Sequence, residues 1–262
     1  MAAPLTLSPS HPLIMLLAAL LSHQELTGVS GTEIINGQKA GRSLFPFMAS
    51  VQNNLKHSCG GVLIQKNFVL TAAHCNKRNL SVVFGSHNIG ENSKGAVRFA
   101  VERKCIHPSF KDIRTGNDIM LLKLSKKVKI IKVARIPTKP RAVGANIRCQ
   151  LAGWGPTETR GLAVDDLRVV NVSTVDLDVC RKKWQDVPFS LPDKVVCAGG
   201  YKSKSGACQG DSGGPLVCAG EVVGIVSFNM RNNCDYPNVP NIHTQVSSFL
   251  SWIRKVLNSS TC

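Results

Sequence analysis

The 262-residue chain has few acidic residues, and its first 33 residues contain no lysine or arginine. It holds 16 Asp and Glu against 32 Lys and Arg; all of the cations but only 14 of the acids follow residue 33, so that part has a net charge of +18. The sequence contains no Cys-x-x-Cys pair and no Cys/His cluster with zinc spacing, which argues against a zinc site or a thioredoxin-like redox site. With 43% hydrophobic and 18% charged residues, the composition excludes a disordered or fibrous protein.

A short apolar run near the N-terminus predicts a secretory signal peptide over residues 1–31. Residues 13–21 are all apolar, and the small residues Val29, Ser30 and Gly31 follow. This run is too short for a membrane anchor, because a spanning helix needs about 20 apolar residues, and no other segment is apolar enough. We therefore expect a secreted protein without a membrane span. The signal would be removed after Gly31 or, alternatively, after Ser30.

Secretion gives meaning to the ten cysteines and to the positive charge. Cysteines form disulfides in an oxidising compartment, and three Asn-x-Ser sequences, at Asn79, Asn171 and Asn258, become candidate glycosylation sites. A net charge of +18 favours polyanions through counterion release. For a secreted protein we expect sulfated glycans or microbial surfaces before nucleic acid. The alternative is that the basic residues serve solubility alone.

From residue 34 onward, short apolar runs separated by Gly, Asn and Pro predict many short strands, the pattern of β-barrels or sandwiches. The runs are residues 61–64, 68–71, 81–84, 119–122, 151–154 and 222–226. Only residues 246–257 repeat apolar side chains at helical spacing, which predicts a C-terminal helix. A basic stretch with prolines, residues 126–141, interrupts the strand pattern near the middle and indicates a linker between two halves.

Three short motifs, far apart in the sequence, carry the groups needed for acyl transfer. LTAAHC contains His74, NDIMLLKL contains Asp118 and GDSGGP contains Ser212. A serine hydroxyl is a poor nucleophile until a base takes its proton, which an imidazole can do when a carboxylate fixes its tautomer. Each motif alone is typical of a turn or a core residue. Together they predict a catalytic triad.

With these motifs the chain resembles the chymotrypsin-fold serine proteases over residues 34–257, and in character it resembles leukocyte granule proteases such as granzymes and neutrophil elastase. The resemblance implies an all-β fold of two packed six-stranded antiparallel Greek-key barrels, about 34–130 and 131–245, and a C-terminal α-helix over about 246–257. No cofactor is implied. The family's calcium loop has carboxylates, whereas the matching stretch here offers only Glu91 and adds Lys94, so we expect no metal.

The resemblance also implies a role for each catalytic residue. His74 would be the general base and then the general acid, Asp118 its orienting carboxylate, and Ser212 the nucleophile. The backbone N–H groups of Gly210 and Ser212 would form the oxyanion hole. Because glycine has no side chain, the backbone at Gly210 can approach the substrate closely.

Asp211 lies beside the nucleophile, but Asp118 already fills the role of the triad acid. The resemblance gives Asp211 another partner, the α-amino group of Ile34, which is created when the preceding segment is removed. If the signal ends at Gly31, only Thr32-Glu33 remains as an activation dipeptide. This junction has no basic residue for a trypsin-like activator, so the resemblance to granule proteases implies a dipeptidyl aminopeptidase.

Disulfide pairing follows from the resemblance, because counting alone cannot connect ten cysteines. The implied pairs are Cys59–Cys75, Cys149–Cys218, Cys180–Cys197 and Cys208–Cys234. Cys105 and Cys262 lie outside the pattern. A bridge between them is one interpretation, and a free or intermolecular thiol is the other.

The resemblance assigns seven residues to substrate binding: Gly206, Ala207, Gln209, Ser227, Phe228, Asn229 and Asn241. Gly206 falls where trypsin-like members hold the aspartate that attracts Lys or Arg, so cleavage after basic residues loses its main attraction. Asn229 and Asn241 should narrow the pocket. We expect cleavage after small to medium aliphatic residues such as Val, Ala, Leu or Met, although an amide could instead bind a polar side chain.

The preferred interpretation is a secreted or granule-stored serine endopeptidase of leukocytes, acting in immune defence on protein substrates. We expect a monomer, with sulfated glycans as partners and serpin-type inhibitors as potential ones. Two alternatives remain at this point. One is a cationic glycan-binding or antimicrobial protein on the same fold, and the other is a narrowly specific complement-type regulator.

Overall fold

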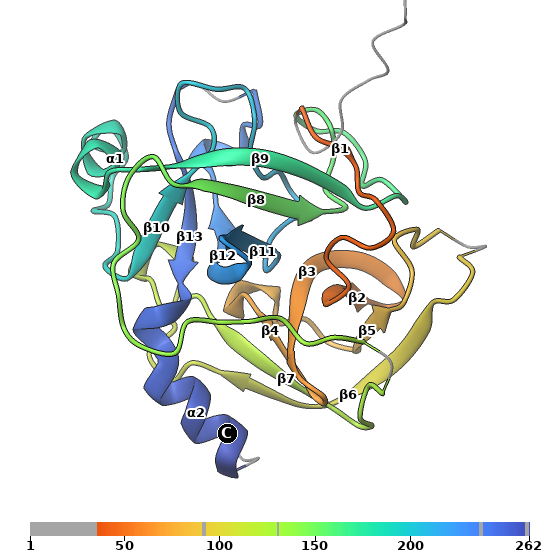
Figure 1. Cartoon of the computed structure of the whole chain (residues 1–262). Coiled ribbons are helices and arrows are strands. Elements are labelled where there is room, and N and C mark those ends of the chain that lie inside the picture. The colour runs from red at the N-terminus through yellow and green to blue at the C-terminus, as the bar shows by residue number, and fades with distance from the viewer. Residues whose placement is uncertain (1–35, 91–92, 130, 236–237, 260–261) are drawn as a thin grey trace, which may run out of the picture. The chain divides into compact units, whose positions relative to one another are not determined.

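The computed structural model describes residues 36–90, 93–129, 131–235, 238–259 and 262 (Figure 1). The expected signal peptide, the activation dipeptide, Ile34 and Glu91 lie outside the described residues. In the part of the chain that the structure describes, no helix has both the length and the apolar character needed to cross a membrane.

Six antiparallel strands close the first barrel in the order β2-β3-β4-β7-β6-β5. The strands are β2 (Met48–Asn53), β3 (Lys56–Gln65), β4 (Phe68–Thr71), β5 (Leu80–Phe84), β6 (Val97–Ile106) and β7 (Met120–Leu124). Four of the six apolar runs expected to form strands lie at β3, β4, β5 and β7, the last beginning one residue before its strand. Their side chains fill the barrel, with Leu63, Leu70 and Leu121 fully buried, each burial stabilising the fold by about 1.5–3 kcal/mol.

The second barrel is also a closed antiparallel ring, in the order β9-β10-β13-β12-β11-β8 with β8 pairing back to β9. The strands are β8 (Arg148–Gly153), β9 (Arg168–Val175), β10 (Val195–Ala198), β11 (Pro215–Cys218), β12 (Glu221–Phe228) and β13 (Asn241–Gln245). A short strand β1 (Gln38–Lys39) pairs with β9. The segment before β2 therefore adds to the second barrel, although it comes first in the sequence.

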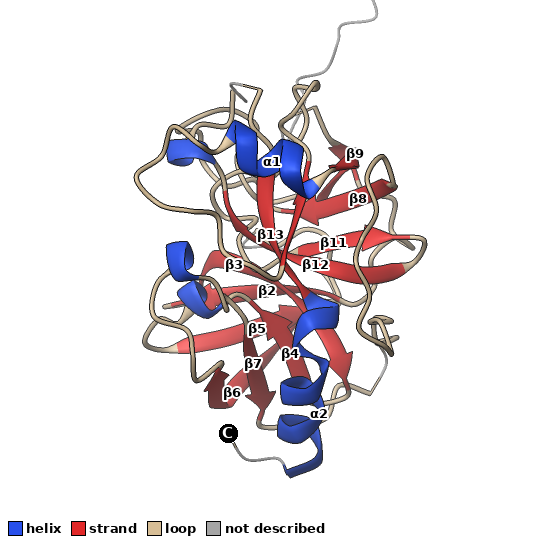
Figure 2. Cartoon of the chain, turned by 90° about the vertical axis from the view of Figure 1, so that its left-hand side faces the viewer, coloured by secondary structure: helices blue, strands red, loops and turns tan. Residues whose placement is uncertain are grey.

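The chain ends in a 3-10 turn, Val246–Phe249, followed by helix α2 (Leu250–Ser259) (Figure 2). Leu250, Ile253 and Val256 are buried on one side of α2, as expected for side chains three residues apart. A second helix, α1 (Leu177–Lys183), is capped by Asp176, whose side chain accepts two backbone N–H groups. The two six-stranded antiparallel barrels and the C-terminal helix are thus confirmed.

Five disulfides connect all ten cysteines. Four are the pairs implied by the resemblance. The fifth joins Cys105 on β6 to Cys262, the last residue, so the structure takes the bridged interpretation of these two cysteines rather than that of free thiols. This bridge fastens the C-terminus to the first barrel, and Cys105 pairs across the sheet with Leu121, three residues after Asp118.

Candidate active site

The three residues expected to form the triad come from both barrels. His74 lies in a single 3-10 turn, Ala73–Cys75, directly after β4, and the Cys59–Cys75 disulfide fastens that turn to β3. Asp118 lies just before β7, and Ser212 lies in the turn before β11. His74 and Ser212 line the same cavity, so residues 138 positions apart in the sequence meet at one cleft.

His74 and Asp118 are joined by two hydrogen bonds. The Nδ1 of His74 lies 2.7 Å from Oδ2 of Asp118, and the backbone N–H of His74 donates to Oδ1 at 2.9 Å. Asp118 is 1% exposed, whereas the side chain of His74 is 27% exposed and reaches the cleft. A buried carboxylate that accepts a bond from Nδ1 leaves Nε2 as the nitrogen that can take a proton from a substrate-facing hydroxyl.

Two hydroxyl groups of the second barrel complete the surroundings of Asp118. The Ser227 hydroxyl donates to Oδ2 of Asp118 at 2.5 Å, and the Thr244 hydroxyl donates to its backbone carbonyl at 2.8 Å. The Ser227 bond, together with the two from His74, satisfies a carboxylate that would be costly to bury unpaired, and the Thr244 bond holds the backbone that carries it. Ser227 was expected to bind substrate; Thr244 was not expected to have any role, because nothing in the sequence around it marks this contact.

The backbone around Ser212 requires glycine at two positions. Gly210 has φ +91°, a conformation that disfavours other residues, and a Cβ there would approach the Cα of Gly155 at 3.3 Å. Gly213 has φ +79°, and a Cβ there would lie 2.1 Å from the Thr71 hydroxyl oxygen. The GDSGG sequence therefore folds into a tight turn around Ser212, in which the Gly214 N–H donates to the Asp211 carbonyl at 2.9 Å.

Asp211 is buried, with 2% of its surface exposed. Its Oδ1 accepts the backbone N–H of Gly155 at 2.8 Å, and its Oδ2 accepts that of Cys208 at 2.9 Å. Burial raises the pKa of Asp211 to about 7, although both hydrogen bonds oppose the shift. No cation among the described residues forms an ion pair with it, so its charge has only these two bonds as compensation.

The cavity beside Ser212 has a volume of about 250 Å³. Six of the seven residues expected to bind substrate line it; Gly206 is buried and does not. Asn241, 1% exposed, accepts the backbone N–H of Ala207 at 3.0 Å, and the Asn229 amide donates to the Ala207 carbonyl at 3.5 Å and contacts Cys234 Sγ at 3.4 Å. Both amides line the cavity and bond to Ala207, the residue after Gly206.

The rim of this cavity is also held in place. Gln209 donates to the Asn232 carbonyl at 3.1 Å, and its Oε1 lies 3.0 Å from Cys208 Sγ. Ile113 lines the cavity and also an adjoining hollow of about 430 Å³ next to His74. Sequence reasoning did not single out Ile113 or Asn232, because neither lies in a motif.

Comparison with known proteins identifies the family to which the chain belongs. A family model described as trypsin matches residues 34–253. The chain belongs to the trypsin family. It is 36% identical to duodenase-1 of Bos taurus over 252 residues, covering 94% of this chain and 96% of that protein. It is also 36% identical to granzyme M of Rattus norvegicus, covering 93% and 96%.

A solved structure titled as the atomic resolution structure of HBP is similar in fold as well. It matches with a TM-score of 0.75 and 33% identity over 86% of this chain and 97% of that one. This trypsin-family chain is therefore a serine endopeptidase, a hydrolase of peptide bonds.

The trypsin-family site contains a further chain of hydrogen bonds that sequence reasoning missed. His57 Nε2 lies 3.0 Å from the Gly210 carbonyl, His57 Nδ1 lies 2.9 Å from the Ser50 hydroxyl, and the Gln52 amide donates to Ser50 at 3.2 Å. Because a carbonyl only accepts, Nε2 carries the proton and Nδ1 accepts from Ser50. Burial lowers the pKa of His57 to about 4, which keeps this neutral arrangement at physiological pH.

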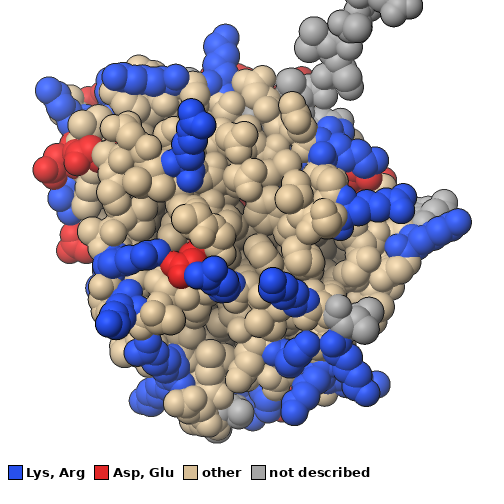
Figure 3. All heavy atoms as spheres, in the orientation of Figure 1, with Lys and Arg blue, Asp and Glu red and all other residues tan. Residues whose placement is uncertain are grey.

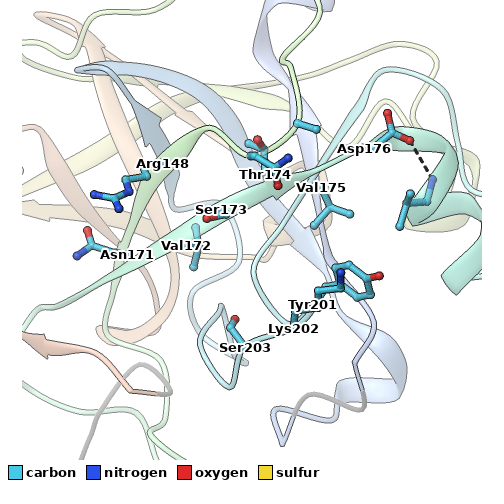
Figure 4. A pocket seen from close by; sticks show the side chains of 13 residues that line it. Arg148, Asn171, Val172, Ser173, Thr174, Val175, Asp176, Tyr201, Lys202 and Ser203 are labelled. Carbon is cyan, nitrogen blue, oxygen red and sulfur yellow. Dashed lines mark hydrogen bonds between the residues drawn. The ribbon is translucent and has the colours of Figure 1, made fainter.

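A separate groove lies on the second barrel, between β8, β9 and the loop of Tyr201 to Ser203 (Figure 4). Its volume is about 630 Å³, and its lining includes Arg148, Asn171 and Lys202. None of the triad residues lines it. The residues expected to be catalytic thus lie at the smaller cleft of about 250 Å³ and not at this groove.

Proposed function

We propose that Ser212 cleaves peptide bonds through an acyl-enzyme, with His74 as the proton carrier. The observation that carries this assignment is the buried Asp118 bonded to His74 at 2.7 Å, on a cleft that His74 shares with Ser212. His74 takes the hydroxyl proton as Ser212 attacks the substrate carbonyl, and then gives it to the leaving amine. Water repeats the two steps on the acyl-enzyme.

The backbone N–H groups of Gly210 and Ser212 stabilise the negative oxygen of the tetrahedral intermediate. Loss of one such donor typically lowers the rate about 100- to 1,000-fold. The support for this role is the turn at Gly210, whose carbonyl is fixed by His57. The held carbonyl belongs to the peptide unit between Gly210 and Asp211, so this bond restrains the Gly210 backbone directly after its own N–H.

Activation uses the α-amino group of Ile34 as the partner of Asp211. A dipeptidyl aminopeptidase removes Thr32-Glu33 and exposes this group. The support is the state of Asp211, a fully enclosed carboxylate with two hydrogen bonds and no cationic partner among the described residues. An inserted ammonium offsets the cost of burying the charge and holds the turn that carries Gly210 and Ser212.

The preferred residue before the cut is uncharged and small to medium in size, such as Val, Ala, Leu or Met. The support is the cavity of about 250 Å³, which Asn241 lines and whose lining residues include no Asp, Glu, Lys or Arg. An ammonium or guanidinium would have to leave water without a carboxylate partner there, and that is strongly unfavourable.

A peptide panel that varies only this residue tests the specificity. Protein beginning at Ile34 should cleave the Val, Ala, Leu and Met peptides, and the Ser212→Ala protein should cleave none. Preferred cleavage after Arg or Lys would contradict the assignment. A preference for Asn or Gln would show that Asn229 or Asn241 binds a polar side chain instead.

We assign the enzyme to secretion or to leukocyte granules, in immune defence. The support is the N-terminal apolar run and the similarity to proteins named granzyme M and mast cell protease 3. Digestion of denatured protein separates this assignment from a narrow complement-type regulator. A general defence protease should cut at many sites, whereas a regulator should cut at few.

A further inference from the structure

The linker between the barrels is the most basic segment of the chain. Residues 125–141 carry seven cations and no acid: Lys126, Lys127, Lys129, Lys132, Arg135, Lys139 and Arg141. The linker crosses the front of the molecule as the green segment of Figure 1, and Lys and Arg side chains spread over the lower half of that face in Figure 3. We call the five lysines of this segment the linker band.

The charges of the linker band are not neutralised by neighbouring acids. Arg135 and Arg141 both pair with Glu221, at 3.3 and 2.5 Å. The five lysines are exposed and form no ion pair with any described residue. Like charges held along one segment repel each other, so the band disfavours the compact state unless a counter-charge is present.

The fold nevertheless holds the band in a fixed arrangement. Val128, Ile131 and Ala134 are at most 8% exposed and face the core, while the lysines between them face solvent. The Val128 N–H donates to the Lys66 carbonyl at 2.7 Å, and the Ala134 N–H donates to the Leu63 carbonyl at 2.8 Å. Binding of a partner to these cations therefore costs little conformational entropy, because the backbone that carries them is already ordered.

The Lys66 side chain adds a cation beside the band, because its Nζ donates to the carbonyls of Lys129 and Ile131 at 3.2 and 3.4 Å. At the other end, Arg254 of α2 donates to the Thr138 carbonyl. The positive strip thus continues from the β3–β4 turn along the linker to the C-terminal helix.

We propose that the linker band is the docking surface for a linear sulfated polysaccharide, on the enzyme assigned under the proposed function. Residues 125–141 contain no aromatic residue on which bases could stack, which disfavours single-stranded nucleic acid. The apolar side chains Val128, Ile131 and Ala134 are buried, which disfavours insertion into a membrane. A flexible sulfated chain can bind through ion pairs with the lysines alone.

Docking at the band leaves the catalytic cleft open. None of its five lysines lines the cavity at Ser212 or the adjoining hollow at Ile113. The polysaccharide should therefore retain the enzyme in its active form rather than inhibit it. Hydrolysis of a short peptide should be the same with and without saturating heparin.

The test compares two variants with equal net charge. The first carries Lys126→Gln, Lys127→Gln, Lys129→Gln, Lys132→Gln and Lys139→Gln. The matched control removes five cations outside the linker: Arg148 and Lys202, which line the groove of Figure 4, Lys204 two residues further along the chain, and Lys182 and Lys183 of α1, each changed to Gln. Heparin affinity is measured against NaCl concentration with all proteins in the Ser212→Ala background, so that autolysis does not interfere.

The band variant should bind heparin at least about 100-fold more weakly, with a salt slope lower by up to about 4.5, since each of the five lost contacts lowers it by about 0.9. The control should stay within about threefold of the parent. Equal losses in the two variants would overturn the proposal, as would tighter binding to duplex DNA or to anionic phospholipid vesicles. Because binding uses inactive protein, a parent enzyme that fails to cleave peptides refutes the proposed function and leaves the docking result independent.

Discussion

Removal of Thr32-Glu33 should stabilise the protein by an amount that grows with pH. Burial raises the pKa of Asp211 to about 7 from an ordinary value of 3.8. A carboxyl with a raised pKa keeps its proton to a higher pH in the folded state than in the unfolded state. The free energy of unfolding of the uncleaved form therefore falls as pH rises from about 4 to 7. At 1.36 kcal/mol per pH unit, the loss reaches about 4 kcal/mol at pH 7.

In the form that begins at Ile34, the ammonium favours the ionised carboxylate and removes this loss. The stability difference between the two forms should thus be near zero at pH 4 and approach about 4 kcal/mol at pH 7. The value at pH 7 is an upper bound, because a loop rearrangement that exposes Asp211 in the uncleaved form would lower the free-energy cost of ionising it. Guanidinium unfolding of both forms at several pH values, each as the Ser212→Ala variant, measures it. A difference that stays constant with pH would refute the pairing of Ile34 with Asp211.

Three further predictions address other parts of the molecule. The double variant Cys105→Ala, Cys262→Ala opens a loop of 157 residues, for which chain entropy sets a ceiling of about 5 kcal/mol. Because other disulfides shorten this loop, the free energy of unfolding should fall by about 2–4 kcal/mol, and an unchanged value would contradict the prediction. Burial lowers the pKa of His57 and of His243 to about 4, so the free energy of unfolding should fall as pH drops below 6.5, by about 2 kcal/mol for each histidine at pH 5. Guanidinium titrations that give the same free energy of unfolding at pH 5 and pH 7 would contradict this. Asn241→Gly should open the cavity toward Gly206 and raise the Phe-to-Val ratio of kcat/KM at least tenfold, whereas an unchanged ratio would show that Asn241 does not limit the pocket.

The strands and catalytic residues that could be predicted from the sequence are those marked by local sequence patterns. The apolar runs at β3, β4, β5 and β7 fill closed barrels because consecutive residues in them are buried. The triad could be predicted because His74, Asp118 and Ser212 lie in three distinctive motifs.

The features that sequence reasoning missed depend on contacts between distant segments. Ser50, Gln52 and His57 look like ordinary strand residues, and only the folding of β2 and β3 against the second barrel brings His57 to the Gly210 carbonyl. Likewise, the sequence predicts that Asn229 and Asn241 narrow the pocket, but it does not predict their shared bonds to Ala207, which depend on how the ends of β12 and β13 meet the loop of Ala207. No spacing in the sequence encodes either contact.

The central claim is that Ser212 is a nucleophile that becomes competent when Ile34 is the N-terminus. A fluorophosphonate probe tests both parts, because it reacts only with an activated serine. Protein beginning at Ile34 should be labelled at Ser212, and protein beginning at Thr32 or carrying His74→Ala should not. Equal labelling of the Ile34 and Thr32 forms, or labelling at any residue other than Ser212, would contradict the account.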